Sequence, residues 1–236
     1  MPSASRTELR VGGLTSLSTC DWPGELAATV FCRGCPWRCR YCHNHHLQDA
    51  AAAPEMTWAE VLAFLRRRAG LLDGVVFSGG EPTVQGGIAA AIGDVRALGF
   101  RVGLHTAGPA PERLTPLLGL LDWVGFDAKA RFGDYAAITG VAGSGERARE
   151  SLMLLLESGV DCEVRTTVHP DLIDAAALGE LAATLAELGV RRHVLQPCRA
   201  EGCADPMLGA ADGAAFAALA RPLAARYGAV SVRERA

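Results

Sequence analysis

The sequence lacks any apolar run that approaches the roughly 20 residues a helix needs to cross a bilayer. Its opening Met1-Pro2-Ser3-Ala4 also lacks the charged-then-apolar pattern of an export signal. We therefore expect a chain that neither enters a membrane nor leaves the cell. Eight cysteines are present all the same. Together these features predict a reducing cytoplasm, in which thiols bind metal instead of forming a disulfide framework.

Charge of one sign is not in excess either. The formal net charge of the 236 residues is -3, half of them are hydrophobic and 21% are charged. This balance excludes a nucleic-acid binder that works through a basic face and is ordinary for a compact enzyme. No linker divides the sequence, so we expect one domain over residues 1–236, with a core over 14–200 and a C-terminal helix and short strand within 209–233.

Three of the cysteines stand close together, in the spacing Cys35-x3-Cys39-x2-Cys42. Three thiolates cannot complete the four-ligand shell of a structural zinc or of a closed iron–sulfur cube. They indicate a cube with one open iron, at which a substrate can bind. Two alternatives stay open at this point. A closed ferredoxin-like cluster could use Cys32 as a fourth ligand, and a zinc site could draw on a larger set of Cys32, Cys35, Cys39, Cys42, His43, His45 and His46.

Apolar strands alternate with amphipathic helices along the rest of the chain. Strands are predicted at residues 26–32, 74–77, 101–105, 123–127, 162–168 and 193–196, with a short terminal strand at 229–232. Helices are predicted after residue 57, over 85–98, 112–121 and 146–158, around 178–188 and around 216–227. This order predicts an α/β fold whose parallel sheet is covered by helices. Six strand–helix units are too few to close an eight-stranded barrel, so we predict a partial, open (β/α)6 barrel.

The unusual polar residues gather where these strands end. The cysteine loop follows the first strand, Gly79-Gly80-Glu81 the second and His105-Thr106 the third. Asp127-Ala128-Lys129, His169 and Gln196 follow the next three. Because ligands of such folds bind at the carboxyl ends of the strands, these residues predict one shared site.

Four motifs together resemble a known family. They are Asp21-Trp22-Pro23-Gly24, the cysteine loop with its continuation Tyr41-Cys42-His43-Asn44, Gly79-Gly80-Glu81-Pro82, and Asp127-Ala128-Lys129. This combination resembles the radical S-adenosylmethionine (radical SAM) activating enzymes of glycyl-radical enzymes, typified by pyruvate formate-lyase activating enzyme. Within that group it is most similar to the anaerobic ribonucleoside-triphosphate reductase activating proteins. The similarity covers residues 14–199 and implies the radical SAM type of partial barrel.

The resemblance implies roles for individual residues. Cys35, Cys39 and Cys42 would hold one 4Fe-4S cluster and, with it, the catalytic chemistry. Gly79 and Gly80 would let the backbone approach the methionine amino group of S-adenosylmethionine. The other implied cofactor-binding residues are Tyr41 and His43 near the adenine, Glu81 at the amino group, Asp127 and Lys129 at the ribose and carboxylate, and Arg165 and His169. A monovalent cation site, present in some members, would lack its acidic ligand here, because His105-Thr106 stands at that place.

The implied function is reductive cleavage of S-adenosylmethionine to make a glycyl radical on a partner, anaerobic ribonucleoside-triphosphate reductase, with a flavodoxin or ferredoxin as the electron donor. Cys198 and Cys203 are too few for a second cluster. Two other functions are alternatives. One is a small-molecule radical SAM enzyme such as a 7-carboxy-7-deazaguanine synthase, which shares the short length and the Gly-Gly-Glu-Pro motif. The other is a zinc-binding interaction module, although a zinc module does not explain why polar clusters follow every strand.

Overall fold

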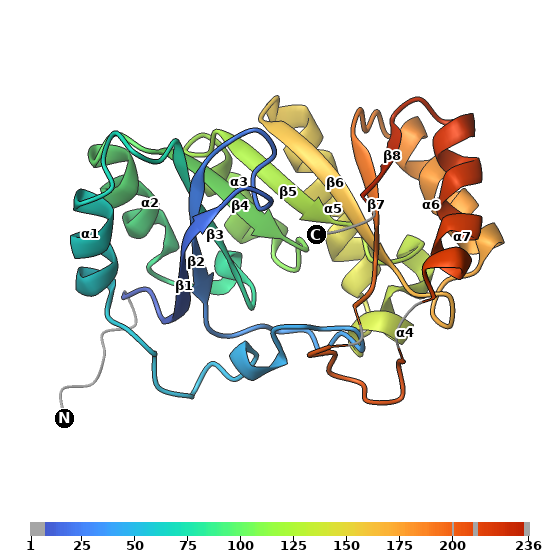
Figure 1. The fold of residues 1–236 in the computed structure, drawn as a ribbon, viewed down its shortest axis with the longest axis horizontal. Helices are drawn as coiled ribbons and strands as arrows, with labels where there is room; N and C mark the ends of the chain where they lie inside the picture. The colour runs from blue at the N-terminus through green and yellow to red at the C-terminus, as the bar shows by residue number, and fades with distance from the viewer. Residues whose placement is uncertain (1–7, 200, 210–211, 234–236) are drawn as a thin grey trace.

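The computed structural model describes residues 8–199, 201–209 and 212–233. Its centre is one sheet of eight strands whose spatial order, β1 to β8, follows the order of the chain (Figure 1). The strands are β1 (Val11–Ser18), β2 (Ala27–Cys32), β3 (Gly74–Gly79), β4 (Arg101–Thr106), β5 (Trp123–Asp127), β6 (Asp161–Val168), β7 (His193–Pro197) and β8 (Val230–Val232). β1 pairs with β2 in the antiparallel sense, and all later neighbours are parallel.

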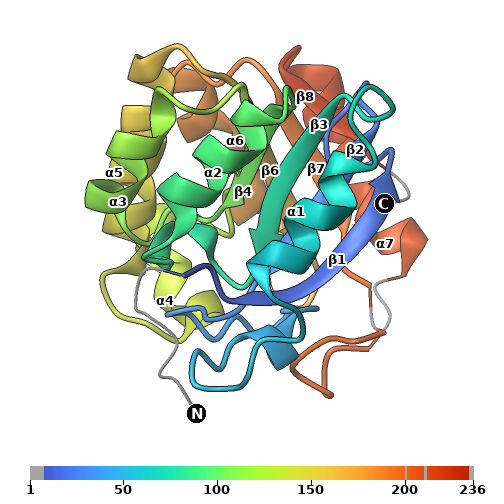
Figure 2. The ribbon, with the colours of Figure 1, turned by 90° about the vertical axis from the view of Figure 1, so that its left-hand side faces the viewer.

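Helices connect the parallel strands and pack on the convex outer face of the curved sheet (Figures 1 and 2). They are α1 (Trp58–Arg66), α2 (Ile88–Ala97), α3 (Pro111–Leu118), α4 (Tyr135–Thr139), α5 (Ser144–Ser158), α6 (Ala175–Glu187) and α7 (Gly213–Arg226). Because β1 and β8 are the two edges of the sheet, the barrel stays open. The predicted partial (β/α)6 barrel is confirmed, with β8 as one more parallel strand and β1 as an antiparallel addition.

Local sequence signals explain where several helices begin and end. Thr57 caps α1 through a reciprocal pair of bonds: its hydroxyl accepts from the Glu60 amide at 3.2 Å, and the Glu60 carboxylate accepts from the Thr57 amide at 2.7 Å. Gly159 ends α5 with a φ of +74°, a conformation that costs glycine little. Among the described residues, no helix is both long and apolar enough to cross a membrane.

Strand β1 was missed by the sequence prediction, which placed the start of the core at residue 14. Its sequence contains Gly12 and Gly13, and its pairing with β2 shifts register twice. Glycine and bulges at an edge strand remove the alternation of apolar and polar residues by which a half-buried strand is recognised.

The loop between β1 and β2 closes the barrel at the end where the parallel strands begin, opposite their carboxyl ends. Trp22 from this loop stacks on Trp123 of β5, with 5.6 Å between the ring centroids. A Cβ atom added to Gly74 or Gly103 would lie 2.8 Å and 3.0 Å from the Trp22 ring, so these strands leave space for it by having no side chain there. The Asp21-Trp22-Pro23-Gly24 motif therefore builds the floor beneath the site.

Candidate active site at the carboxyl ends of the strands

The cysteine loop leaves the end of β2 and is held in place by backbone bonds on both sides. The Gly34 amide donates to the Leu47 carbonyl at 2.6 Å. Farther along, the amides of Arg38 and Arg40 donate to the carbonyls of Thr139 and Ile138 in α4, at 2.8 and 3.0 Å. The loop conformation thus depends on a short helix that lies about 100 positions away in the sequence.

The two glycines at the end of β3 fit against this loop. Gly79 has a φ of +109°, and a Cβ atom there would overlap the backbone of Cys32. A Cβ atom on Gly80 would overlap the Gly34 carbonyl. In addition, the Asn44 side-chain amide donates to the Gly79 carbonyl at 3.3 Å. The absence of side chains at Gly79 and Gly80 is therefore required by the packing of the cysteine loop itself.

Glu81 is a buried carboxylate that joins the ends of β3 and β4. Its Oε1 accepts from the Thr83 amide (3.1 Å), the Thr83 hydroxyl (2.7 Å) and the Thr106 hydroxyl (2.7 Å), and its Oε2 accepts from the Ala107 amide (3.0 Å). Burial raises the pKa of this carboxyl, and the four hydrogen bonds oppose that rise. Glu81 also caps the short 3-10 helix Pro82–Val84, so the helix-capping role expected of such a carboxylate is present.

Asp127 ends β5, and Lys129 follows two residues later in the adjoining loop. The Lys129 ammonium lies 3.3 Å from the Asp127 carboxylate and 5.6 Å from the centre of the Tyr41 ring. Burial of Lys129 disfavours its charge, but Asp127 together with the neighbouring Tyr41, Cys39 and Tyr135 side chains offsets this and holds the pKa of the amine well above its usual value. The Tyr41 hydroxyl is buried without a hydrogen-bond partner among the described residues, and burial raises its pKa.

These residues line one cavity of about 200 Å³. It brings together most of the predicted site, namely Cys35, Cys39, Tyr41, Cys42, His43, Gly79, Gly80, Glu81, Asp127 and Lys129. Other residues also line it, namely Trp37, Asn44, Ser78, Ala107 and Thr167, together with His105, Thr106 and Gln196, which the strand-end pattern predicted at this site. Six of these eight residues stand at one of the last two positions of a strand or directly after it, a signal that was available in the sequence.

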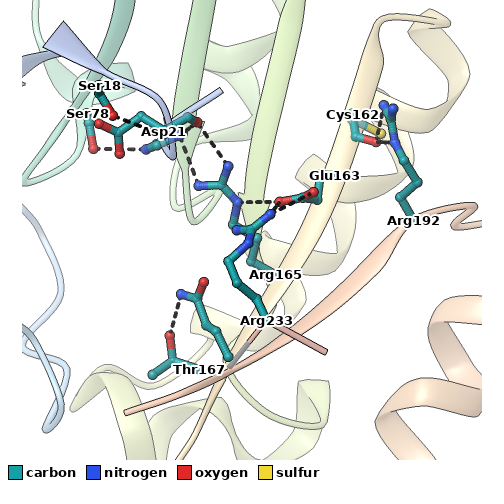
Figure 3. Close-up of polar contacts among 11 residues, drawn as sticks. Ser18, Asp21, Ser78, Cys162, Glu163, Arg165, Thr167, Arg192 and Arg233 are labelled. Atoms are coloured by element: carbon teal, nitrogen blue, oxygen red, sulfur yellow. Dashed lines mark hydrogen bonds and ion pairs between the residues drawn. The ribbon is translucent and has the colours of Figure 1, made fainter. Parts of the chain in front are cut away.

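Arg165 lies outside this cavity, in a polar network that extends from it toward Asp21 in the loop between β1 and β2 (Figure 3). Its Nε donates to the Glu163 carboxylate at 2.8 Å, its Nη2 donates to the Asp21 carbonyl at 3.0 Å, and its Nη1 lies 3.0 Å from His105 Nε2. Arg233 donates to both oxygens of the same Glu163 carboxylate, at 3.0 and 3.2 Å. Each of the three guanidinium nitrogens of Arg165 thus has a protein partner in this network, which makes a structural role the better interpretation.

His169 is also outside the cavity. It is buried in the loop after β6, and its Nε2 lies 3.1 Å from the Gly209 carbonyl. Gly209 belongs to the segment that follows β7, so His169 links the loop after β6 to the segment after β7. The structure separates both Arg165 and His169 from the residues that share the cavity.

The thiols of the cysteine loop are the candidate ligands of the cluster that the resemblance implies. Among the described residues, no three His, Cys, Asp or Glu side chains converge around one point, which is the arrangement that a zinc ion needs. A 4Fe-4S cube instead binds each thiolate at a different iron, so its ligands stand apart. Burial, and then the Glu81 charge, raises the pKa of the Cys35 thiol to about 12, and burial also raises that of Cys39.

Comparisons with known proteins identify the family of the chain. The sequence profile of the radical SAM superfamily matches residues 29–190. A glycyl-radical enzyme activating enzyme of Methanocaldococcus jannaschii, so named, is 31% identical over 185 residues, which are 74% of this chain and 75% of that protein. The pyruvate formate-lyase-activating enzyme of Clostridium pasteurianum is 32% identical over 173 residues, 70% of this chain and 71% of that protein.

Solved structures share the fold at low identity. SuiB of Streptococcus suis bound to S-adenosylmethionine superposes with a TM-score of 0.66 at 14% identity, over 85% of this chain and 48% of SuiB. QueE of Escherichia coli superposes with a TM-score of 0.59 at 17% identity, over 99% of this chain and all of QueE. The fold, the shared cavity and the sequence relatives lead to one conclusion: the chain belongs to the radical SAM superfamily and, within it, to the activating enzymes of glycyl-radical enzymes.

Proposed function

We propose that Cys35, Cys39 and Cys42 hold one 4Fe-4S cluster, that S-adenosylmethionine binds in the adjoining cavity, and that the enzyme makes a glycyl radical on anaerobic ribonucleoside-triphosphate reductase. The observation that carries the proposal is the shared cavity, in which three thiols, two close-packed glycines and a buried lysine meet at the carboxyl ends of parallel strands. When bound, the cluster would supply the electron that cleaves S-adenosylmethionine to methionine and a 5′-deoxyadenosyl radical.

The chain's own residues would then bind and orient the substrate. Lys129 presents a retained positive charge that suits the methionine carboxylate, and Asp127 offers carboxylate oxygens to the ribose hydroxyls. The Tyr41 ring, with the backbone of the adjoining cluster loop, would pack on the adenine. Glu81 already accepts four hydrogen bonds from Thr83, Thr106 and Ala107. It would therefore fix the ends of β3 and β4 in position as well as accept a hydrogen bond from the methionine amino group of S-adenosylmethionine.

The open barrel supports a protein substrate. β1 and β8 do not pair in the described sheet, which leaves a lateral opening through which a glycine-bearing loop could reach the cavity. The relatives at 31% and 32% identity are named as activating enzymes, and this favours a glycyl-radical partner over a free small molecule. The reductase as the specific partner rests on the resemblance of the sequence motifs. We further propose a flavodoxin or ferredoxin as electron donor and, because all eight cysteines are free, a reducing cytoplasm as the place of work.

Cysteine replacements test the cluster assignment. Cys39→Ala removes one of three thiolates, so we expect a loss of nearly all cluster iron after anaerobic reconstitution, whereas Cys162→Ala should retain the iron of the parent. Iron and sulfide per chain, with the visible absorbance of the cluster, are the readouts. A full cluster in Cys39→Ala would refute the ligand set.

Isotope transfer tests the partner. The reductase from the same genome, deuterated at glycine Cα, is incubated with the enzyme, S-adenosylmethionine and a reductant. We expect an organic radical with a doublet electron paramagnetic resonance signal, and deuterium in the 5′-deoxyadenosine. If the reductase is activated but the 5′-deoxyadenosine contains no deuterium, direct abstraction by this enzyme is contradicted. If S-adenosylmethionine is cleaved but no radical forms on the reductase, the family function stands and this partner is rejected.

A further inference from the structure

The cavity of the candidate site has an ionisable wall and a neutral wall. Every ionisable side chain that lines it comes from the end of β2, β3, β4 or β5 or from the loop that follows, and these are Cys35, Cys39, Tyr41, Cys42, His43, Glu81, His105, Asp127 and Lys129. Among the described residues, β6 and β7 add only Thr167 and Gln196, and neither side chain is charged. The cavity therefore offers ionic contacts on one side and only neutral hydrogen bonds on the other.

Thr167 and Gln196 form a pair at the end of their strands. They occupy matching positions in the parallel register of β6 and β7, so both side chains lie on the same face of the sheet. The Gln196 Nε2 atom donates to the Thr167 hydroxyl oxygen at 3.2 Å (Figure 3). Glu163 and Arg165 precede Thr167 at alternate positions of β6, which places all three on the inner face of the barrel. The bond to Thr167 thus fixes the direction of the Gln196 amide at the cavity.

This pair keeps hydrogen-bonding groups that no described residue uses. A glutamine amide carries two N–H donors and a carbonyl acceptor, and Thr167 takes only one of the donors. The Gln196 Oε1 atom and the Thr167 hydroxyl hydrogen have no partner among the described residues, and both side chains are half-buried. An N–H donor beside a C=O acceptor is complementary to the C=O and N–H groups of a polypeptide backbone.

The proposed cofactor accounts for the ionisable wall but not for the neutral one. S-adenosylmethionine carries its charges on the amino, carboxylate and sulfonium groups, which suit charged partners such as Lys129 and Asp127, and its adenine would pack on the Tyr41 ring. The second reactant must lie beside it in the same cavity. Of the strands that line the cavity, β7 is the one next to β8, the edge at which the sheet stays open. A loop of another protein that enters from this edge would meet the neutral wall.

We propose that Thr167 and Gln196 form a subsite for the backbone of the partner protein, at the peptide units next to the glycine that loses its hydrogen. The inference rests on the proposed function. Glycine has no side chain, so a site that selects it has only the neighbouring backbone to bind. Neutral amide and hydroxyl groups bind a backbone without burying an unpaired charge. Both residues are therefore specificity-determining for the protein substrate.

Direct binding tests this subsite separately from turnover. The cluster-loaded, full-length enzyme is mixed with S-adenosylmethionine but no reductant, and its affinity for the reductase from the same genome is measured by surface plasmon resonance. Gln196→Met keeps the length of the side chain and removes the amide, so we expect this affinity to fall about five- to tenfold. Thr167→Val is nearly isosteric and releases the amide, so we expect a loss of about threefold. The affinity of the same proteins for S-adenosylmethionine should fall by a smaller factor, and the KM for the reductase in radical formation should rise more than kcat falls.

Thr184→Val in α6 is the matched control, because it removes a hydroxyl that donates to the Glu180 carbonyl within its own helix and should leave reductase binding as in the parent. The cluster absorbance and the melting temperature verify that each variant is folded and loaded.

Three outcomes would overturn the subsite, and they differ in what they say of the proposed function. Parental affinity for the reductase in both Gln196→Met and Thr167→Val, with a parent that activates the reductase, overturns the subsite and leaves the proposed function intact. An equal loss of affinity for S-adenosylmethionine and for the reductase also overturns it, because the pair would then contact the cofactor. A parent that cleaves S-adenosylmethionine but neither binds nor activates the reductase rejects the proposed partner, and the subsite with it.

Discussion

Lys129 is the only lysine in the sequence; arginine provides the other 22 of the 23 basic residues. The chain thus uses arginine at every other basic position and lysine only here. A guanidinium is larger and planar, and the space between Asp127 and the Tyr41 ring is occupied by a compact ammonium. This composition signal singles out a cavity residue without any structural information.

Replacing this amine should therefore weaken substrate binding. Lys129→Met keeps much of the aliphatic stem and removes the charge, and losing one charge-assisted hydrogen bond should lower the affinity for S-adenosylmethionine roughly ten- to a hundredfold. The cluster absorbance should not change, because Lys129 is not a thiolate ligand. Equilibrium binding to the reconstituted enzyme is the measurement. Arg131→Met, which removes an exposed cation two residues away, is the control, and equal affinities in both variants would place the substrate elsewhere.

At the scale of elements, the site depends on how closely the end of β3 meets the end of β2. Gly79 pairs with Cys32 in the parallel register and has a φ that side chains rarely adopt. Gly80 donates its amide to the Cys32 carbonyl at 2.8 Å. β2 therefore delivers the cysteine loop, and the backbone of β3 and of the residue after it holds the start of that loop in place.

Gly79→Ala should separate these two elements. The added Cβ atom overlaps backbone atoms, which cannot rotate away, so we expect a loss of about 2–4 kcal/mol in the free energy of unfolding and reduced cluster assembly. Gly93→Ala in α2 is the matched control, because an added Cβ there meets nothing within 4 Å and should stabilise the helix by up to about 1 kcal/mol. Urea denaturation measures both, and a tolerated Gly79→Ala would contradict the packing argument.

The contact between β6 and β7 predicts a dependence of stability on pH. His193 is buried there, its Nε2 lies 2.9 Å from the Thr166 hydroxyl, and burial lowers its pKa from 6.5 to about 4. Between these two values the unfolded chain binds more protons than the folded one. The free energy of unfolding should therefore fall as the pH drops from about 6.5 to about 4, by at most about 3 kcal/mol for this group, and should level off below.

Denaturation of His193→Gln and of the parent, at a series of pH values across this window, isolates the contribution. His105, whose pKa burial and then Arg165 also lower to about 4, contributes in the same window and is present in both proteins. The slope should be shallower in His193→Gln and unchanged in His46→Gln, which replaces an exposed imidazole. Parallel slopes for His193→Gln and the parent would show that His193 is not held neutral by the fold.

At the scale of the molecule, the open barrel is filled in layers. The stacked Trp22 and Trp123 rings form its floor, at the end where the parallel strands begin. The network of Arg165, Glu163 and Arg233 lies within it (Figure 3), and the candidate site occupies the carboxyl ends of the strands. Arg165 also lies over the Trp123 ring, 5.0 Å from its centre, so the layers contact one another. The floor and the site are thus parts of one packed interior.

Removal of the floor should affect the whole fold. Trp22→Ala leaves a large cavity between β3, β4 and β5, and we expect a loss of about 3–5 kcal/mol in the free energy of unfolding. Leu17→Ala on β1, whose side chain is 54% exposed, should change it by less than about 0.5 kcal/mol. Chemical denaturation followed by circular dichroism compares them. A cost below 1 kcal/mol for Trp22→Ala would mean that the barrel does not need its floor.

The sequence by itself determined the α/β order, the six parallel strands, the cysteine loop and most of the cavity residues. It could do so because strand ends in a parallel sheet meet at one edge, so that Gly79, Glu81 and Asp127 are brought together by topology alone. Only the tertiary structure decided which way Arg165 and His169 face, that Trp22 enters the barrel, and that Cys203 rests on Arg40. These depend on side-chain direction and on contacts between distant loops, which periodicity does not encode.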